Sequence, residues 1–305
     1  MKNCLYIWIL VAFGLIDVLL GDAVHNSNQI AQNQAIGAMS EFDAIGQLVT
    51  NFSDGSTVRS SLTYIGRGSL GAEYGTGNLF IGSAHATVGS GNVNAESFDF
   101  AFGANPEMPV WSATTSIPAV IHPNFVLGSN GYDPINPDVA LFQVNESFPF
   151  SPVEFLPDGY EISVDDEFAS VSYGRTQILQ DVIDIEPYRG GFFDTIERFG
   201  DSTFGISTNY FWNSLSVSGD DAVVTPGSSG GAALIDIDGT YHYGGTATYL
   251  IGTGNFFSRG GYADGRLGRD FASQYLSSVP EPNSLCIFGL TLVLAVGFRK
   301  KKCSL

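Results

Sequence analysis

Short runs of apolar and β-branched residues, separated by Gly, Asn, Asp and Pro, dominate the middle of the chain. Such runs predict the strands of an all-β protein, because these residues favour the extended surface of a sheet and the separating residues favour turns. There is no strand-helix-strand alternation of the kind that builds a parallel sheet. The seven clearest runs are residues 61–66, 78–81, 118–121, 139–144, 167–173, 232–237 and 243–251.

Helical periodicity is scarce and is clearest at the end of this region. Residues 266–276 place Leu267, Phe271 and Leu276 at intervals that suit one face of a helix, which predicts a short C-terminal helix. A proline-rich stretch at residues 148–158 divides the β-rich region into halves of similar length. We therefore expect two β lobes joined by this stretch, with the helix after the second lobe.

Residues 1–23 have the order of a secretory signal peptide. Lys2 precedes an apolar run at residues 5–16, and small residues up to Ala23 suit cleavage. The run is shorter than the ~20 residues of a spanning helix and an aspartate follows it, so cleavage is favoured over an uncleaved anchor. Residues 24–41 are rich in Asn, Gln and Ala with little periodicity, which predicts a flexible leader or pro-segment.

The other end combines three features in a fixed order. A Pro-Glu-Pro triplet at residues 280–282 precedes an apolar stretch at 285–298 and four basic residues at 299–302. A basic cluster after a short apolar segment puts that cluster on the cytoplasmic side of a membrane. The order resembles the PEP-CTERM sorting signal of exopolysaccharide-producing Gram-negative bacteria, so we expect residues 278–305 to be a sorting segment. The resemblance implies export, transient membrane association and removal of the tail by an exosortase; an ordinary anchor is the alternative.

Charge and cysteine usage narrow the classes of function. Residues 24–278 contain 28 Asp and Glu against 8 Arg and no Lys, an acidity that excludes nucleic-acid binding. Cys4, Cys286 and Cys303 all lie in the two segments expected to be removed. The mature domain is therefore expected to have no disulfide, which a core of roughly 250 residues tolerates.

A serine in a glycine-dense turn is the first candidate for chemistry. Ser229 lies within Gly-Ser-Ser-Gly-Gly at residues 227–231, where glycines permit a sharp bend that exposes the hydroxyl. His85 ends an apolar strand after two small residues and can reach a cleft, whereas the two later histidines suit a turn and packing. Asp138 opens an apolar strand, where a carboxylate is costly to bury without a partner. A hydroxyl, an imidazole and a buried carboxylate are the groups of a serine-hydrolase triad.

Three blocks carry a family resemblance: Ser-Ala-His ending at His85, Pro-Asp-Val-Ala-Leu around Asp138, and Gly-Ser-Ser-Gly-Gly around Ser229. They resemble the signature blocks of the trypsin and chymotrypsin family, in the family's order, with separations of 53 and 91 residues. The resemblance implies an all-β fold of two antiparallel β-barrels, at residues 42–150 and 151–277, followed by the short helix.

The resemblance also implies a role for each residue. Ser229 is expected to be the nucleophile, His85 the general base and then acid, and Asp138 the group that orients the imidazole. The backbone N–H groups of Gly227 and Ser229 are expected to form the oxyanion hole. We therefore expect an exported serine endopeptidase that acts on protein or peptide substrates through an acyl-enzyme intermediate.

Two departures from the family pattern bear on activation and specificity. Animal digestive members carry Asp before the nucleophile to pair with a newly cut N-terminus; Ser228 stands there, so this switch is expected to be absent. Val223 stands where the family places the floor of the primary specificity pocket, and Thr248 with Tyr249 is expected in its wall. An uncharged floor predicts cleavage after apolar residues rather than after Lys or Arg.

Two other functions compete with this interpretation. Residues 227–231 also fit the Gly-x-Ser-x-Gly elbow of α/β-hydrolase esterases, but that fold needs Asp and then His after the serine, and only His242 follows, too soon. A catalytically silent surface or matrix protein that keeps the protease fold stays open as the alternative, because sequence does not show whether the cleft is open. The sequence contains no motif for a metal site, a nucleotide or a cofactor.

Overall fold

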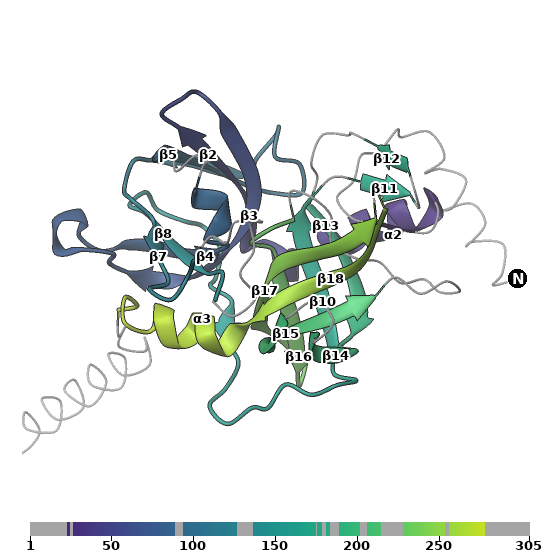
Figure 1. The fold of residues 1–305 in the computed structure, drawn as a ribbon. Helices are drawn as coiled ribbons and strands as arrows, with labels where there is room; N and C mark the ends of the chain where they lie inside the picture. The colour runs from purple at the N-terminus through teal and green to yellow at the C-terminus, as the bar shows by residue number, and fades with distance from the viewer. Residues whose placement is uncertain are drawn as a thin grey trace, which may run out of the picture.

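A computed structural model of the chain describes residues 23–24, 27–88, 94–126, 137–174, 176–178, 181–183, 189–201, 206–214, 228–253 and 256–277. Within this part of the chain, strands form two large sheets and one small sheet, and the α-helices are short (Figure 1). The all-β architecture predicted from the sequence pattern is confirmed. Each of the seven predicted runs lies in or overlaps a strand, namely β3, β4, β7, β8, β10, β16 and β17.

The first large sheet has the order β6-β5-β2-β3-β4-β8-β7, with neighbours antiparallel. Its interior is filled by aromatic rings; on β5, Phe98, Phe100 and Phe102 are buried and the residues between them are not, as the two-residue repeat of a strand requires. The strands are β2 (Ile45–Phe52), β3 (Thr57–Gly68), β4 (Gly77–Gly82), β5 (Ala95–Phe102), β6 (Trp111–Thr115), β7 (Val120–Ile121) and β8 (Ala140–Val144).

The second large sheet has the order β13-β10-β16-β17-β18-β15-β14, and β9 adds to β17 in parallel. Its strands are β9 (Glu154–Phe155), β10 (Glu167–Tyr173), β13 (Arg189–Thr195), β14 (Arg198–Asp201), β15 (Ile206–Ser214), β16 (Ala232–Ile237), β17 (Thr240–Thr253) and β18 (Phe256–Asp264). The small sheet consists of β1 (Ala23–Val24), β11 (Thr176–Ile178) and β12 (Asp181–Ile183).

The two large sheets share part of one hydrophobic core. The larger cluster of buried residues fills the first sheet and also includes Val171, Ala232 and Tyr243 from the second. A smaller cluster lies within the second sheet. The proline-rich stretch spans the two sheets, because Phe148 and Phe150 pack against the larger cluster and β9 joins β17. The boundary placed at residue 150 stays a prediction.

The predicted C-terminal helix is present but shorter than expected. α3 spans Gly265–Ala272, and the side chain of Asp264 caps it by accepting from the N–H of Arg266 at 2.9 Å. Phe271 is buried in the larger cluster with its ring beside that of His122, and the helix also contacts β17, β18 and β9 of the second sheet (Figure 1). Leu276 lies beyond the helix, because the chain turns there to form a bridge with Gly68.

The predicted flexible leader contains a helix instead. α2 spans Ser27–Gly37 and contacts β13. Six of its eleven residues are Ser, Asn or Gln, and its four Ile and Ala residues form no marked apolar stripe, so periodicity could not indicate it. The helix is held by close backbone packing: a side chain on Gly37 would lie 2.1 Å from the carbonyl oxygen of Arg189, and one on Gly191 would lie 2.9 Å from Ile36.

Candidate active site

His85 lies three residues after Gly82, the last residue of β4. Ser83 and Ala84 are buried, and His85 then begins a single 3-10 turn, η3, that ends at Thr87. The side chain of His85 is 17% exposed, so the ring meets both solvent and the protein interior. The prediction that two small residues let this ring leave the strand agrees with its position.

Asp138 reaches His85 because β8 pairs antiparallel with β4. Gly82 lies opposite Ala140, so the chain that leaves β4 meets the chain that enters β8. The Oδ1 atom of Asp138 accepts from the backbone N–H of His85 at 2.8 Å, and Oδ2 lies 2.5 Å from the ring Nδ1. Only 5% of the carboxylate side chain is exposed. Since the carboxylate accepts, Nδ1 carries the proton and Nε2 is free to accept.

Ser229 lies in the turn that enters β16. The N–H of Gly231 donates to the carbonyl oxygen of Ser228 at 2.8 Å, and Gly230 has a φ of 84°, a left-handed conformation that favours glycine. The Oγ atom of Ser229 lies 2.9 Å from Nε2 of His85. The structure therefore brings the three predicted residues together as one hydrogen-bonded chain from hydroxyl to imidazole to carboxylate.

Burial and Asp138 act on the pKa of His85 in opposite directions. Burial lowers this pKa, but the charge of Asp138 and its hydrogen bond raise it, and the net result is a pKa above the ordinary value of 6.5. The imidazolium is thus stabilised by the carboxylate beside it. His122 provides a contrast, because burial lowers its pKa and its Nδ1 accepts from the N–H of Asn124 at 3.2 Å.

Of the other predicted site residues, Thr248 is the one whose side chain the structure describes. Gly227 and Val223 lie outside the described residues, so the oxyanion hole and the floor of the specificity pocket stay predictions. Thr248 lies in β17, is 5% exposed, and donates its hydroxyl hydrogen bond to the carbonyl oxygen of Thr246 at 3.1 Å. Its place in a pocket wall also stays a prediction.

Two buried hydroxyls near the triad were not identified from the sequence. Tyr243 and Thr246 of β17 are almost fully buried, and their hydroxyls are hydrogen-bonded to each other. The pKa of Tyr243 is raised, first by burial; its bond to Thr246 lowers it, and the charge of Asp138 raises it further. The phenol is therefore neutral and within electrostatic reach of the triad carboxylate. In a sequence, tyrosine and threonine in a strand indicate only β propensity.

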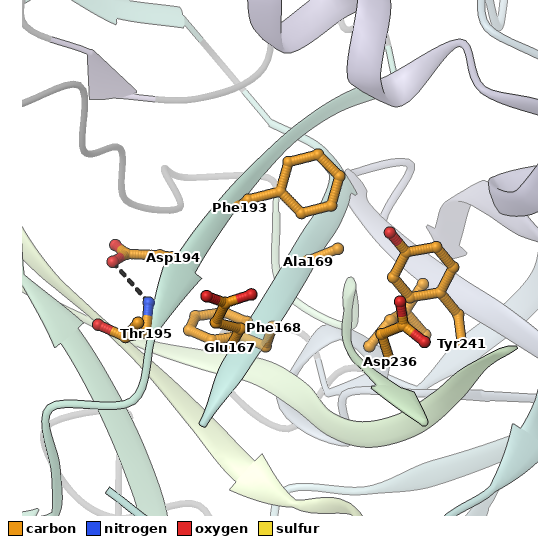
Figure 2. Close-up of a pocket in the computed structure, with 9 residues that line it drawn as sticks. Glu167, Phe168, Ala169, Phe193, Asp194, Thr195, Asp236 and Tyr241 are labelled. Carbon is orange, nitrogen blue, oxygen red and sulfur yellow. Dashed lines mark hydrogen bonds between the residues drawn. The ribbon is translucent and has the colours of Figure 1, made fainter. Parts of the chain in front are cut away.

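The hollow shown in Figure 2 is not part of this site. It has a volume of about 470 Å³, lies over β10, β13 and β16 of the second sheet, and none of the triad residues lines it. Three carboxylates, those of Glu167, Asp194 and Asp236, contribute to its lining beside Phe193. Figure 2 shows the carboxylate of Asp194 accepting from the N–H of Thr195, at 2.7 Å. The triad, and not this hollow, is the candidate for chemistry.

The described residues contain neither a cluster of metal ligands nor a membrane-spanning helix. No group of three or more His, Cys, Asp or Glu side chains there is arranged to hold a metal ion. No helix in the same part of the chain is long and apolar enough to cross a membrane. The apolar stretch at residues 285–298, on which the predicted membrane association depends, lies outside that part.

The C-terminal segment matches a known family model. Residues 278–302 match the PEP-CTERM protein-sorting motif. This match confirms the predicted sorting signal and indicates an exported protein of a Gram-negative bacterium. None of the curated proteins matches the chain.

The fold is similar to that of a solved structure, HL collagenase at 1.7 Å resolution. The TM-score is 0.55 and the sequence identity 15%, with 76% of this chain and 93% of that chain covered. At this identity the likeness establishes the fold alone. The chain has a chymotrypsin-like fold of two curled antiparallel sheets, as the resemblance implied, and combines this fold with an export signal.

Proposed function

We propose that the chain is an exported serine endopeptidase that hydrolyses peptide bonds through Ser229, His85 and Asp138. One observation supports this above all: Nε2 of His85 lies 2.9 Å from the serine hydroxyl while Nδ1 lies 2.5 Å from the buried carboxylate. A histidine that only satisfied a buried aspartate would need no hydroxyl at its second nitrogen. The arrangement is that of an activated nucleophile with an oriented base.

The first half of the reaction forms an acyl-enzyme. The Oγ atom of Ser229 attacks the carbonyl carbon of the substrate as its proton passes to Nε2 of His85. The imidazolium is stabilised by Asp138, which holds the ring through Nδ1 and through the backbone N–H of residue 85. The ring then gives its proton to the departing amine, and the C–N bond breaks.

The second half hydrolyses the acyl-enzyme. Water attacks the ester carbon, its proton passes to Nε2 of His85, and the ring returns that proton to the Oγ atom of Ser229 as the acid product leaves. In this proposal the N–H groups of Gly227 and Ser229 stabilise the oxyanion in both halves. An exosortase-type enzyme removes the C-terminal tail during export, and the substrate is a protein or peptide.

Labelling with a fluorophosphonate tests the proposal on the exported protein. The reagent forms a P–O bond to Ser229 with loss of fluoride, and this requires the base as well as the hydroxyl. We expect the wild type to be labelled, Ser229→Ala to be unlabelled, and hydrolysis of a casein substrate to fall about a million-fold in that variant. Ser273→Ala, at an exposed serine that caps α3, is the matched control and should be labelled normally.

The alternative, a silent surface or matrix protein with a protease fold, is decided by the same experiment. A folded wild type that neither reacts with the fluorophosphonate nor cleaves casein contradicts the peptidase proposal and favours the silent protein. Labelling that persists in Ser229→Ala would show that a different serine reacts.

A further inference from the structure

The turn that carries Ser229 lies between β3 and the end of β4, two neighbouring strands of the first large sheet. β3 pairs with β4 up to Leu62 opposite Gly82, and the pairing stops there. Gly230 occupies the next position: a side chain on it would lie 2.0 Å from the carbonyl oxygen of Ser61 and 3.1 Å from the backbone nitrogen of Ser83. Ser83 is two residues before His85. The nucleophile turn therefore sits in the fork between β3 and the segment that leads to the base.

Ser61 makes the hydrogen bonds that hold this fork. Its backbone N–H, which has no partner on β4, donates to the carbonyl oxygen of Ser229 at 2.7 Å. Its Oγ atom accepts from the backbone N–H of Tyr173 at 2.8 Å. Ser61 itself is fully buried. Ser61, a residue of the first large sheet, thus makes two bonds. Its backbone N–H binds the residue that carries the nucleophile, and its side chain binds the second large sheet.

The strand that Ser61 bonds also lies against the nucleophile turn. β10 pairs with β16 only as far as Val171 opposite Ala232, so the N–H of Tyr173 has no partner on β16. A side chain on Gly231 would lie 2.5 Å from the Cβ atom of Ser172 and 2.8 Å from the carbonyl oxygen of Val171. The end of β10 therefore forms one wall of the turn, and the Ser61 hydroxyl fixes the position of that wall.

We propose that Ser61 is a positioning residue for the triad: its hydroxyl, by holding Tyr173 on β10, keeps the turn with Ser229 at hydrogen-bonding distance from His85. This inference rests on the proposed function. If the hydroxyl is removed, a buried N–H loses its acceptor, and the end of β10 shifts to find another one. A displacement of about 1 Å between nucleophile and base is enough to lower a rate ~100-fold.

Ser60 provides a matched control on the same strand. It is buried like Ser61, and its hydroxyl has no hydrogen-bond partner among the described residues. Since successive residues of a strand face opposite sides, Ser60→Ala makes the same chemical change on the other face of β3. Comparing the two variants therefore separates the effect of removing any buried serine hydroxyl from β3 from the effect of removing the hydrogen bond to Tyr173.

The test compares the maximal rate of fluorophosphonate inactivation, the apparent affinity for the reagent and the thermal midpoint in each protein. For Ser61→Ala we expect the maximal rate to fall 10- to 100-fold with unchanged affinity, and for Ser60→Ala a rate within twofold of the wild type. Ser61→Cys keeps a side chain of similar volume but replaces the hydroxyl with a weak hydrogen-bond acceptor. It is the variant to measure if Ser61→Ala does not fold, and the same fall in rate is expected.

The possible failures are distinguishable. Wild-type rates in folded Ser61→Ala or Ser61→Cys, or equal falls in the Ser60 and Ser61 variants, overturn the positioning role while the peptidase proposal stands. A wild type that does not react at all overturns both.

Discussion

Two ion pairs among the described residues differ in which partner is shielded from solvent. In the pair of His85 and Asp138 the acid is buried, with 5% of its side chain exposed, and the base is the group that loses its charge. In the pair of Arg189 and Asp43 the base is buried, with 1% exposed, and the acid is 36% exposed. A guanidinium does not lose its charge in a protein, so its partners must always be present.

The surroundings of Arg189 meet that requirement. Its Nε and Nη1 atoms donate to the carbonyl oxygens of Gly37 and Phe42, at 2.5 and 2.8 Å, and Nη2 donates to Asp43 at 2.8 Å. The backbone N–H of Arg189 donates to the carbonyl oxygen of Ala104 at 3.1 Å. In the proposed reaction the first pair gains and loses its charge, whereas the second pair fastens residues 37–43 to β13.

Among changes to these two ion pairs, the largest effect is expected from Asp138→Asn, measured as kcat/KM on casein or as the rate of fluorophosphonate inactivation. Without the carboxylate the ring is free to take the other tautomer and its cation is not stabilised, so we expect a fall of about 10,000-fold, or ~5 kcal/mol of activation free energy. His122→Gln changes a histidine outside the triad and should stay within threefold. A fall of less than tenfold for Asp138→Asn would show that the carboxylate does not support the base.

The same variant should shift the pH dependence in a known direction. In the wild type the pKa of His85 is raised, so activity, which needs the neutral ring, should increase with pH through a midpoint above 6.5. The stabilising charge pair follows the opposite course: it is complete below 6.5 and is lost as pH rises through the raised pKa. In Asp138→Asn only burial acts on the ring, so the midpoint of the residual activity should move below that of the wild type.

A smaller effect, on stability, is expected from Arg189→Ala. The substitution removes a fully buried side chain and leaves the carbonyls of Gly37 and Phe42 without their donor. We expect the free energy of unfolding in urea to fall by about 3–5 kcal/mol. Arg59→Ala, at an exposed arginine of β3, should change it by less than about 0.5 kcal/mol. Equal losses in the two variants would contradict the fastening role of Arg189.

The sequence indicated which three side chains meet better than it indicated the strands around them. His85, Asp138 and Ser229 could be identified because few residue types perform acyl transfer, and because Asp138 opened an apolar strand where an unpaired carboxylate is costly. β2 and β5 were not among the predicted runs. β2 is buried along most of its length on both faces and so does not alternate, while β5 alternates but carries Glu96 and Asp99.

Ser61 and Arg189 could not have been identified from the sequence, for a shared physical reason. Apart from the Asp43 carboxylate beside Arg189, their partners are backbone groups: the N–H of Tyr173 and the carbonyl of Ser229 for Ser61, the carbonyls of Gly37 and Phe42 for Arg189. Every residue except proline carries both groups, so no residue type marks the partner. These backbone groups are available for such bonds because strand pairing ends at that point. Where the pairing ends is a property of the assembled sheets.

The smallest effect is expected from Asp43→Asn, which keeps an acceptor for Nη2 and removes only the charge. Because this carboxylate is 36% exposed and the two backbone carbonyls still bond the guanidinium, we expect a loss of about 0.5–1 kcal/mol in the free energy of unfolding, smaller at high salt. Urea unfolding of the wild type and the variant at low and high NaCl measures it. A loss as large as that of Arg189→Ala would mean that the buried guanidinium depends on a compensating charge and not on carbonyl dipoles. In that case the two ion pairs would be alike after all, and residues 37–43 would be held by electrostatic attraction.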